Sequence, residues 1–493
     1  MRNPRVKSLA RILADGKSSE HGLKRTLGPW TLTAMGVGGI IGTGIFVLTG
    51  VAAATRAGPA LTISFVIAGI VSALAALCYA EVSRKLPISG SAYTYAYATF
   101  GELFAWIIGW DLVLEYGVGA ATVSIGWSGY FVNFMQTAFG WKLPDAWTHS
   151  PFDPVRGIAN LPAAFIVLLL TALLARGTRE SSTVNTIAVS LKVAVVLFFI
   201  VVGFGHVNPA NWHLPAGPTT GAGGYFPFGW TGVCGGAAFI FFAYFGFDAV
   251  STAAEESLNP ARDLPFAIIM SLAICTLLYI PVVVILTGMA PFNELNVASP
   301  VAFAVIRAGM PWAGAVICVG ALAGITTVLL VSLFSQSRIF FSMSRDGLVP
   351  PSFTRLHPTW RTPIYSTLFF GIVIALTAAF TPIDFVGSLT NMGVLAAFIL
   401  VSAAVPILRK KHPELNAGGF QVPFGPRLIP ALSALTAFGL MVSLMFNSPR
   451  IFGIPLPWFA FTVWLAIGLI IYYAYGRNHS IAGKQDENDE KAA

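Results

Sequence analysis

The sequence predicts an all-α integral membrane protein with twelve transmembrane helices. Of its 493 residues, 56% are hydrophobic and only 10% are charged, whereas soluble domains have about 25% charged residues. The apolar residues form continuous runs of about 20 residues, the length that an α-helix needs to cross a bilayer. They lack the alternation of apolar and polar residues that is typical of a transmembrane β-barrel.

The apolar runs also predict the orientation of the chain. The candidate spans are 29–56, 59–84, 101–135, 160–177, 183–205, 229–254, 265–290, 312–343, 363–380, 385–408, 428–446 and 457–476. An even number of spans places both termini on one side, and 23 of the 29 Lys and Arg residues then lie on that side. The positive-inside rule therefore predicts cytosolic termini. The net charge of +8 reflects this asymmetry and does not indicate a nucleic-acid partner.

We expect four parts along the chain. They are a cytosolic arm over 1–27, an inverted-repeat transport core over 28–408, two further helices over 409–476 and a polar, mobile cytosolic tail over 477–493. The arm is polar and basic, without the apolar segment and cleavage site of a signal peptide. The four cysteines lie in apolar runs, and we interpret them as packing residues rather than disulfides or metal ligands.

The first span is unusually rich in glycine. Six glycines fall between Gly36 and Gly50, three of them in the segment Gly39-Ile-Ile-Gly42-Thr43-Gly44. Glycine costs roughly 1 kcal/mol relative to alanine within a helix. A membrane helix that opens here, and turns bare backbone toward a ligand, explains this composition. We therefore predict a break in the first helix.

A second break is predicted in the sixth span, where Gly246 and Asp248 lie near the middle of an apolar run. Spans one and six are five helices apart, so a repeat of five helices would place the second copy inverted in the membrane. Interrupted helices at matching positions of two inverted halves indicate the binding site of a secondary transporter.

Four ionisable residues lie inside predicted spans: Asp111, Glu115, Lys192 and Asp248. Each costs about 2.5–3.5 kcal/mol to insert, and so needs a role. Lys192 and Glu115 form either a structural ion pair or a proton-linked network, because burial disfavours the charged form of lysine. Asp111 could meet water near a helix end. Asp248 could cap the second half of the sixth helix.

Several motifs together resemble a known family. They are Gly38-Gly-Ile-Ile-Gly-Thr-Gly-Ile-Phe46, Pro87-Ile-Ser-Gly-Ser-Ala-Tyr93, Ala254-Glu-Glu-Ser-Leu-Asn-Pro-Ala-Arg-Asp-Leu-Pro265 and Arg338-Ile-Phe-Phe-Ser-Met-Ser-Arg-Asp-Gly-Leu-Val-Pro350. With them the chain resembles the amino acid–polyamine–organocation superfamily, and most of all its bacterial cationic amino acid transporters. The resemblance implies a leucine-transporter-like fold of five plus five inverted helices, with helices 1 and 6 broken and two helices appended.

The resemblance also implies a substrate site at the two breaks. Backbone N–H groups near Thr43 and Gly44 would bind the substrate carboxylate, as at other helix N-termini. Carbonyl groups at both breaks would bind its ammonium group, and Asp248 and Glu115 would face its side chain. Lys192, with Glu115, would couple transport to protons. The residues expected to contact the ammonium are Ile40, Ile41, Phe242, Ala243 and Phe245.

Two features leave alternatives open. The Thr326-Thr327 pair is of the kind that sodium sites use, although a lysine ammonium in that place would exclude sodium. Phe245 is bulky, so the side-chain pocket could be too small for arginine.

We therefore expect a proton-coupled symporter of cationic amino acids such as arginine, lysine or ornithine in the cytoplasmic membrane. Transport of small neutral amino acids, amino acid exchange and sensing without transport are the alternatives. The expected partners are the amino acid, protons and membrane lipid, and a small membrane protein or a sterol in a helix groove is also left open. No cofactor or metal is expected, and neither the motifs of hydrolases nor the continuous polar lining of a channel is present.

Overall fold

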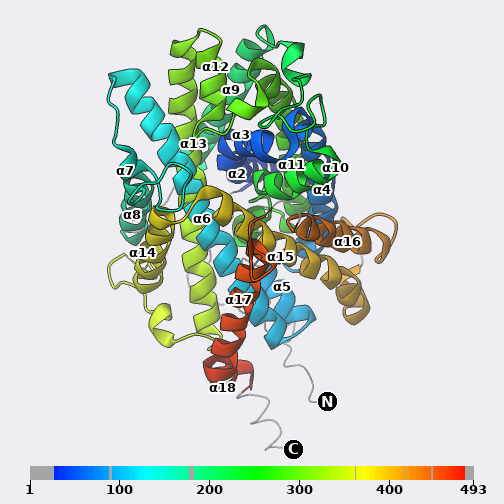
Figure 1. Ribbon diagram of the computed structural model, residues 1–493. Helices are drawn as coiled ribbons and strands as arrows, with labels where there is room; N and C mark the ends of the chain where they lie inside the picture. The colour runs from blue at the N-terminus through cyan, green and yellow to red at the C-terminus, as the bar shows by residue number, and fades with distance from the viewer. Residues whose placement is uncertain are drawn as a thin grey trace, which may run out of the picture.

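The computed structural model is a bundle of helices (Figure 1) and describes residues 27–87, 91–176, 182–360, 362–416, 418–445 and 448–483. Within these ranges the strands are the two short ones of a hairpin, β1 (Arg450–Ile451) and β2 (Ile454–Pro455). The predicted all-α membrane fold is thus confirmed.

Ten of the predicted spans are formed by one principal helix each. These helices are α4 (Leu61–Lys85), α6 (Glu102–Phe139), α8 (Leu161–Ala175), α9 (Ser182–Phe204), α11 (Pro260–Met289), α13 (Pro311–Arg345), α14 (Ile364–Phe380), α15 (Ile383–Lys411), α16 (Leu428–Ser443) and α17 (Leu456–Ile471). Eight helical segments of the described chain are long and apolar enough to cross a membrane, and α8, α14 and α16 are shorter apolar helices. One of the eight, Pro29–Lys85, contains both the first and the second predicted span.

The remaining two spans, the first and the sixth, are interrupted. The first consists of α2 (Pro29–Ile40), the π-helical turn η1 (Gly44–Leu48), α3 (Thr49–Ala52) and the π-helical turn η2 (Ala53–Ala57). The sixth consists of α10 (Gly229–Ile240) and the 3₁₀ turns η5 (Phe241–Tyr244) and η6 (Asp248–Glu256). We call them helix 1 and helix 6.

Short elements extend or connect these helices. They are η3 (Gly58–Ala60), α5 (Ser91–Thr99), α7 (Asp145–Thr148), η4 (Pro209–Trp212), η7 (Phe292–Glu294), α12 (Pro300–Arg307), η8 (Pro351–Thr354), η9 (Pro413–Asn416), η10 (Tyr472–Gly476) and α18 (Arg477–His479). In Figure 1, α5 and α18 lie at the lower end and α12 at the upper end. We call the lower end the inner face, since the sequence predicts it to be cytosolic, and the upper end the outer face.

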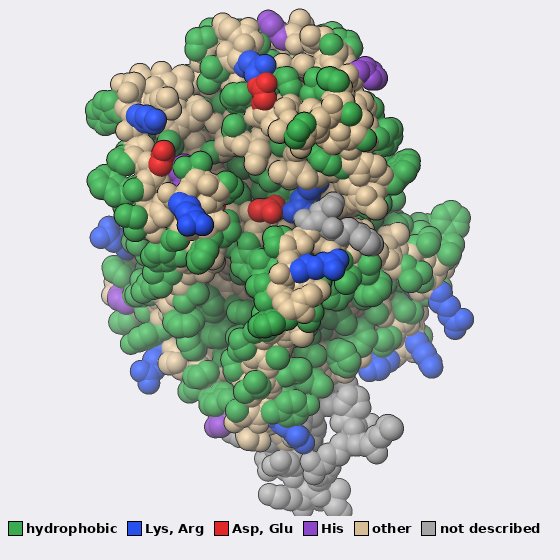
Figure 2. Space-filling model, in the orientation of Figure 1, with side chains coloured by type: hydrophobic (Ala, Val, Ile, Leu, Met, Phe, Trp, Pro, Cys, Tyr) green, Lys and Arg blue, Asp and Glu red, His purple; other side chains and the backbone are tan. Residues whose placement is uncertain are grey.

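Apolar side chains cover most of the face seen in Figure 2, on which charged side chains are few. Three such side chains are each at least half exposed: Phe165 on α8, and Phe369 and Ile372 on α14. The segment Leu456–His479, which contains α17, is also largely exposed, since only 22% of its most apolar part is buried. Apolar surface of this extent, on helices of this length, is the surface that a bilayer covers.

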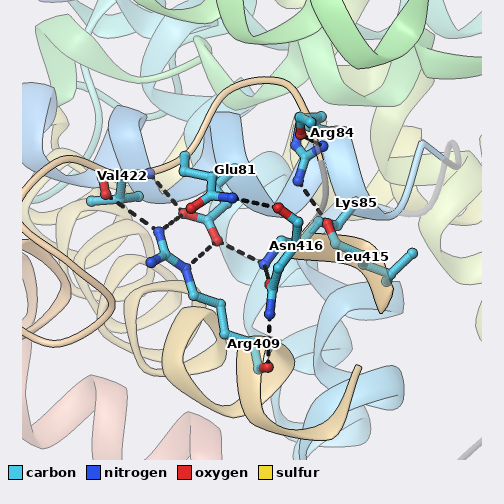
Figure 3. A network of polar contacts seen from close by, with 9 residues as sticks. Glu81, Arg84, Lys85, Arg409, Leu415, Asn416 and Val422 are labelled. Atoms are coloured by element: carbon cyan, nitrogen blue, oxygen red, sulfur yellow. Dashed lines mark hydrogen bonds and ion pairs between the residues drawn. The ribbon is translucent and has the colours of Figure 1, made fainter. Parts of the chain in front are cut away.

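A buried ionic network joins α4 to α15 at their inner ends (Figure 3). The fully buried carboxylate of Glu81 pairs with Lys85 at 2.8 Å and with Arg409 at 2.5 Å, and it accepts a hydrogen bond from the Val422 N–H at 2.7 Å. Lys85 in turn donates to Asn416 at 2.8 Å. Three donor groups therefore satisfy this carboxylate, and the loop after α15 is fixed against α4.

The end of the described chain differs from expectation. The polar composition after Arg477 predicts a mobile tail, but α18 and residues 480–483 pack against the bundle, and Ser480 is only 1% exposed. Most of the predicted arm, residues 1–26, and the last part of the tail, 484–493, lie outside the described residues.

Candidate substrate site

The break in helix 1 lies where the glycines predict it. Helix α2 ends at Ile40, and Ile41 is extended, with φ −72° and ψ 102°. Helical structure resumes at Gly44. Because the next residues do not continue the α-helix, carbonyl groups at the end of α2 lack their usual N–H donors. Polar groups from elsewhere must bind these carbonyls.

The break in helix 6 has a different backbone. After η5, Phe245 is extended, with φ −59° and ψ 140°. Gly246 comes next, with φ +103°, a conformation that glycine adopts without steric penalty and other residues rarely adopt. The turn η6 begins two residues later, at Asp248.

The two breaks contact each other through their backbones. A Cβ atom on Gly246 would lie 2.7 Å from the carbonyl oxygen of Gly39. A Cβ atom on Gly44 would overlap the Cα atom of Ala243. Glycine at these positions therefore allows an approach that any side chain would prevent. The predicted site residues of helices 1 and 6 thus lie side by side.

Side chains of three other helices bind the carbonyls of helix 1. Lys192 of α9 is fully buried, and its Nζ donates to the carbonyl oxygen of Gly38 at 2.5 Å. The hydroxyl of Tyr279 on α11 donates to Ile40 at 3.0 Å, and that of Tyr130 on α6 donates to Phe46 at 2.8 Å. The carbonyl of Ile40, expected to meet the substrate ammonium, thus already has one donor and keeps a second lone pair.

The stem of Lys192 lies against α13. A Cβ atom on Gly324 would lie 2.9 Å from its Cγ atom. The nearby hydroxyl pair is engaged within the protein, because Thr327 donates to Gly324 at 2.9 Å and Thr326 donates to Leu322 at 2.7 Å. The predicted lysine and the threonine pair therefore belong to one region beside the helix 1 break.

Three carboxyl groups gather beside the helix 6 break. Asp111, Glu115 and Asp248 are 2%, 1% and 2% exposed, and Glu115 lies within electrostatic range of the other two. Asp248 accepts a hydrogen bond from the Tyr116 hydroxyl at 2.9 Å. Within the described chain, both carboxyl oxygens of Asp111 and the Oε2 of Glu115 have no hydrogen-bond partner. Burial without donors is costly for a carboxyl group.

The burial of Asp111 contradicts one interpretation made from the sequence. A carboxylate near a helix end could meet water, but this residue is buried inside α6. Its Oδ1 lies against α15, at 2.9 Å from the position of a Cβ atom on Gly393. It belongs to the buried cluster, like Glu115.

Aromatic rings form another wall of the site. Phe242 and Phe245 are stacked, with ring centroids 5.7 Å apart, and Phe245 lies 5.7 Å from the ring of Tyr116. The ring of Phe245 would be 3.7 Å from a Cβ atom on Gly119, which is an ordinary contact distance, so Phe245 packs close to α6. Phe245 thus packs against Phe242 and Tyr116, and the predicted narrowing of the side-chain pocket stays a prediction.

Asn391 of α15 is a polar residue next to the helix 6 break that the sequence prediction missed. Its Nδ2 donates to the carbonyl oxygens of Ala238 at 2.9 Å and Phe239 at 2.7 Å, at the end of the outer half of helix 6. The side chain is fully buried, and its Oδ1 has no partner among the described residues. A search for ionisable residues does not find Asn391. The polar pair Thr390-Asn391 within an apolar run is a signal that could have revealed it.

The family is evident from comparison with known proteins. The family model described as "Amino acid permease" matches residues 27–474, nearly the whole described chain. The protein belongs to the amino acid permease family. The predicted membership in the amino acid–polyamine–organocation superfamily is thereby confirmed.

The relatives of this permease are named after different substrates. It is 48% identical to the branched-chain amino acid permease BcaP of Bacillus subtilis (strain 168) over 97% of its own length and 98% of the relative. It is 47% identical to the methylthioribose transporter of the same organism, over 97% and 99%. It is 37% identical to cationic amino acid transporter 4 of Homo sapiens, over 84% and 66%. The permease is therefore a multi-pass membrane protein of a transporter family.

Proposed function

We propose that this permease transports amino acids by proton-coupled symport, and that the substrate backbone binds between the two breaks. The carboxylate would accept hydrogen bonds from N–H groups near Thr43 and Gly44, where helix 1 resumes. The ammonium group would donate to carbonyls of Ile41 and the Phe242–Phe245 segment. The observation that supports this most directly is the backbone contact of Gly39 with Gly246. This contact brings the two interrupted backbones together, which supports a binding site shared by both helices.

Lys192 and Glu115 are the residues proposed to couple transport to protons. A protonated Lys192 holds the carbonyl of Gly38 at 2.5 Å. Loss of its proton weakens this bond, because a charge-assisted hydrogen bond is roughly twice as strong as a neutral one. Helix 1 would then be released on its inner side. Glu115, buried among other carboxyl groups, would accept and release protons as the surrounding charges change.

The substrate side chain is proposed to be apolar. Phe242, Phe245 and Tyr116 present rings at the helix 6 break, and rings of this kind favour apolar groups over hydrated ones. A relative 48% identical over 97% of the chain is named for branched-chain amino acids. Branched-chain neutral amino acids, which are larger than the small neutral amino acids expected as the alternative, are thus the first candidate.

Cationic amino acids, the first expectation from the sequence, are the second candidate. The specific observation in their favour is the group of three buried carboxyls, of which Asp111 and Glu115 have oxygens without partners in the described chain. An ammonium or guanidinium group of the substrate would satisfy them. Relatives named cationic amino acid transporters are 37–38% identical over 84% of this chain.

Competition for uptake tests the proposal. Purified permease in sealed proteoliposomes, acidic outside, should accumulate labelled leucine, and dissipating the pH gradient should abolish accumulation. Unlabelled leucine and valine should compete better than arginine, lysine or alanine, with methylthioribose as a further competitor. Accumulation that persists without the gradient contradicts proton coupling. Arginine as the best competitor favours the second candidate, and uptake no greater than in empty vesicles contradicts amino acid transport.

A further inference from the structure

The chain segment 477–483, which we call the strap, docks on the inner face. The carbonyl oxygen of His479 would overlap a Cβ atom placed on Gly347, so the strap and the end of α13 touch backbone to backbone. The N–H of Ile481 donates to the carbonyl of Asp346 at 3.1 Å. The hydroxyl of Ser480 donates to the carboxylate of Glu102, at the start of α6. The strap is therefore held by backbone and side-chain bonds to two helices.

The short helix α5, which we call the lid helix, lies between the strap and the substrate site. It packs against α6, α15 and η6, the inner half of helix 6. Its Tyr95 is fully buried and lies near Asp248 and Ser251 of η6. The lid helix thus covers helix 6 on the inner side of its break.

Two tyrosines connect the lid helix to the residues that hold the strap. Tyr93 and Tyr97 are four residues apart and therefore on one side of the helix. Tyr93 donates to the carboxylate of Asp346 at 2.7 Å, and Tyr97 donates to that of Glu102 at 3.4 Å. Glu102 and Asp346 are thus each hydrogen-bonded both to the lid helix and to the strap.

Glu102 has hydrogen-bond donors on three segments. Its side chain is 2% exposed, and besides Tyr97 and Ser480 it accepts a hydrogen bond from Tyr472 at 2.9 Å. A buried carboxylate needs such donors, since leaving one unsatisfied is costly. Removing the strap would take away one donor and the backbone contacts beside Asp346, and would loosen the lid helix.

We propose that Glu102 and Asp346 are positioning residues through which the strap holds the lid helix closed over the inner side of the helix 6 break. The strap then sets how often the inner side opens, without touching the substrate. This role extends beyond substrate choice and proton coupling.

Cysteine labelling of the full chain in detergent tests the proposal. The reporter is Ser251→Cys, a fully buried position beside Tyr95, in a parent chain whose four free cysteines are replaced by alanine. Truncation after Gly476 removes residues 477–493, the strap included, whereas truncation after Gly483 removes only residues 484–493 and keeps the strap. The first truncation should raise the rate of maleimide labelling roughly tenfold, the size expected from losing one or two hydrogen bonds. The second should leave the rate unchanged.

A point substitution guards against misfolding of the shortened chain. Ser480→Ala removes the hydroxyl that bonds Glu102, and should raise the labelling rate in the same direction. Ser480→Thr keeps a hydroxyl and should restore the original rate, which loss of packing alone does not predict. Equal labelling rates in the truncation after Gly476, in Ser480→Ala and in the parent would overturn the proposal. Labelling needs no substrate, so this result is separate from the outcome of the uptake experiment.

Discussion

The two helix breaks reach the same contact by different means. Helix 6 bends through its own backbone, with Gly246 at φ +103°. Helix 1 has no such residue at its break: Ile41 has φ −72° and Thr43 has φ −53°. It is held open by donors from outside, foremost Lys192 on Gly38 at 2.5 Å.

This difference indicates which break can change state. A backbone conformation that depends on a glycine has no proton to gain or lose. A bond from a lysine can be switched, because the charge of the donor depends on its proton. We therefore infer that helix 6 is the fixed half of the site and helix 1 the switched half, and three substitutions test this assignment.

The largest effect is expected for Gly246→Ala. The conformation is unfavourable for alanine by about 1–2 kcal/mol, and the new Cβ atom would lie 2.7 Å from the Gly39 oxygen, so the breaks must separate. Uptake should fall to the level of empty vesicles. Gly439→Ala is the matched control, since it lies in α16 with nothing within 4 Å. Uptake by Gly246→Ala at the parent rate would contradict the fixed role of helix 6.

A large but selective effect is expected for Lys192→Met. Methionine keeps the apolar stem but leaves the Gly38 carbonyl without its donor, at a cost of about 1–3 kcal/mol. Uptake down a substrate gradient should persist at a reduced rate, while accumulation driven by a pH gradient should vanish. Lys410→Met, on the exposed end of α15, serves as the control. Accumulation that still responds to the pH gradient would assign the switch to another group.

A smaller effect is expected for Asn391→Leu. The substitution keeps the volume but leaves the carbonyls of Ala238 and Phe239 without its amide donors, a loss of about 1–3 kcal/mol. The apparent KM for substrate should rise more than the maximal rate falls, because the outer half of helix 6 is displaced. Thr390→Val is the control, since that hydroxyl bonds Val386 of its own helix, at 2.9 Å. If Asn391→Leu and Thr390→Val have the same apparent KM and maximal rate, Asn391 does not contribute to the site.

The spans and both breaks could be predicted from the sequence because their signals are local. Apolar runs predict the helices. Glycines such as Gly44 and Gly246 are costly within a continuous membrane helix, and therefore indicate a break. The ionisable residues were found for the same reason, since each is expensive in lipid.

The partners of these residues could not be predicted, because they depend on packing between distant segments. Lys192 bonds a backbone carbonyl of Gly38, 154 residues away, which no side-chain pattern reveals. Neutral polar residues such as Asn391 and Tyr279 carry no charge to mark them. The strap was missed because its polar composition is also that of a mobile tail. The inner location of the termini stays a prediction.

The network of Figure 3 has a consequence for biosynthesis. Glu81 and Arg409 are 328 residues apart, so the ribosome delivers the arginine long after α4 has been made. Until then Lys85, one turn away on the same helix, is the neighbour available to neutralise Glu81. The early helix thus carries a temporary counter-ion of its own, and arrival of α15 completes the pairing. The final packing of α4 against α15 therefore depends on synthesis of the tenth span.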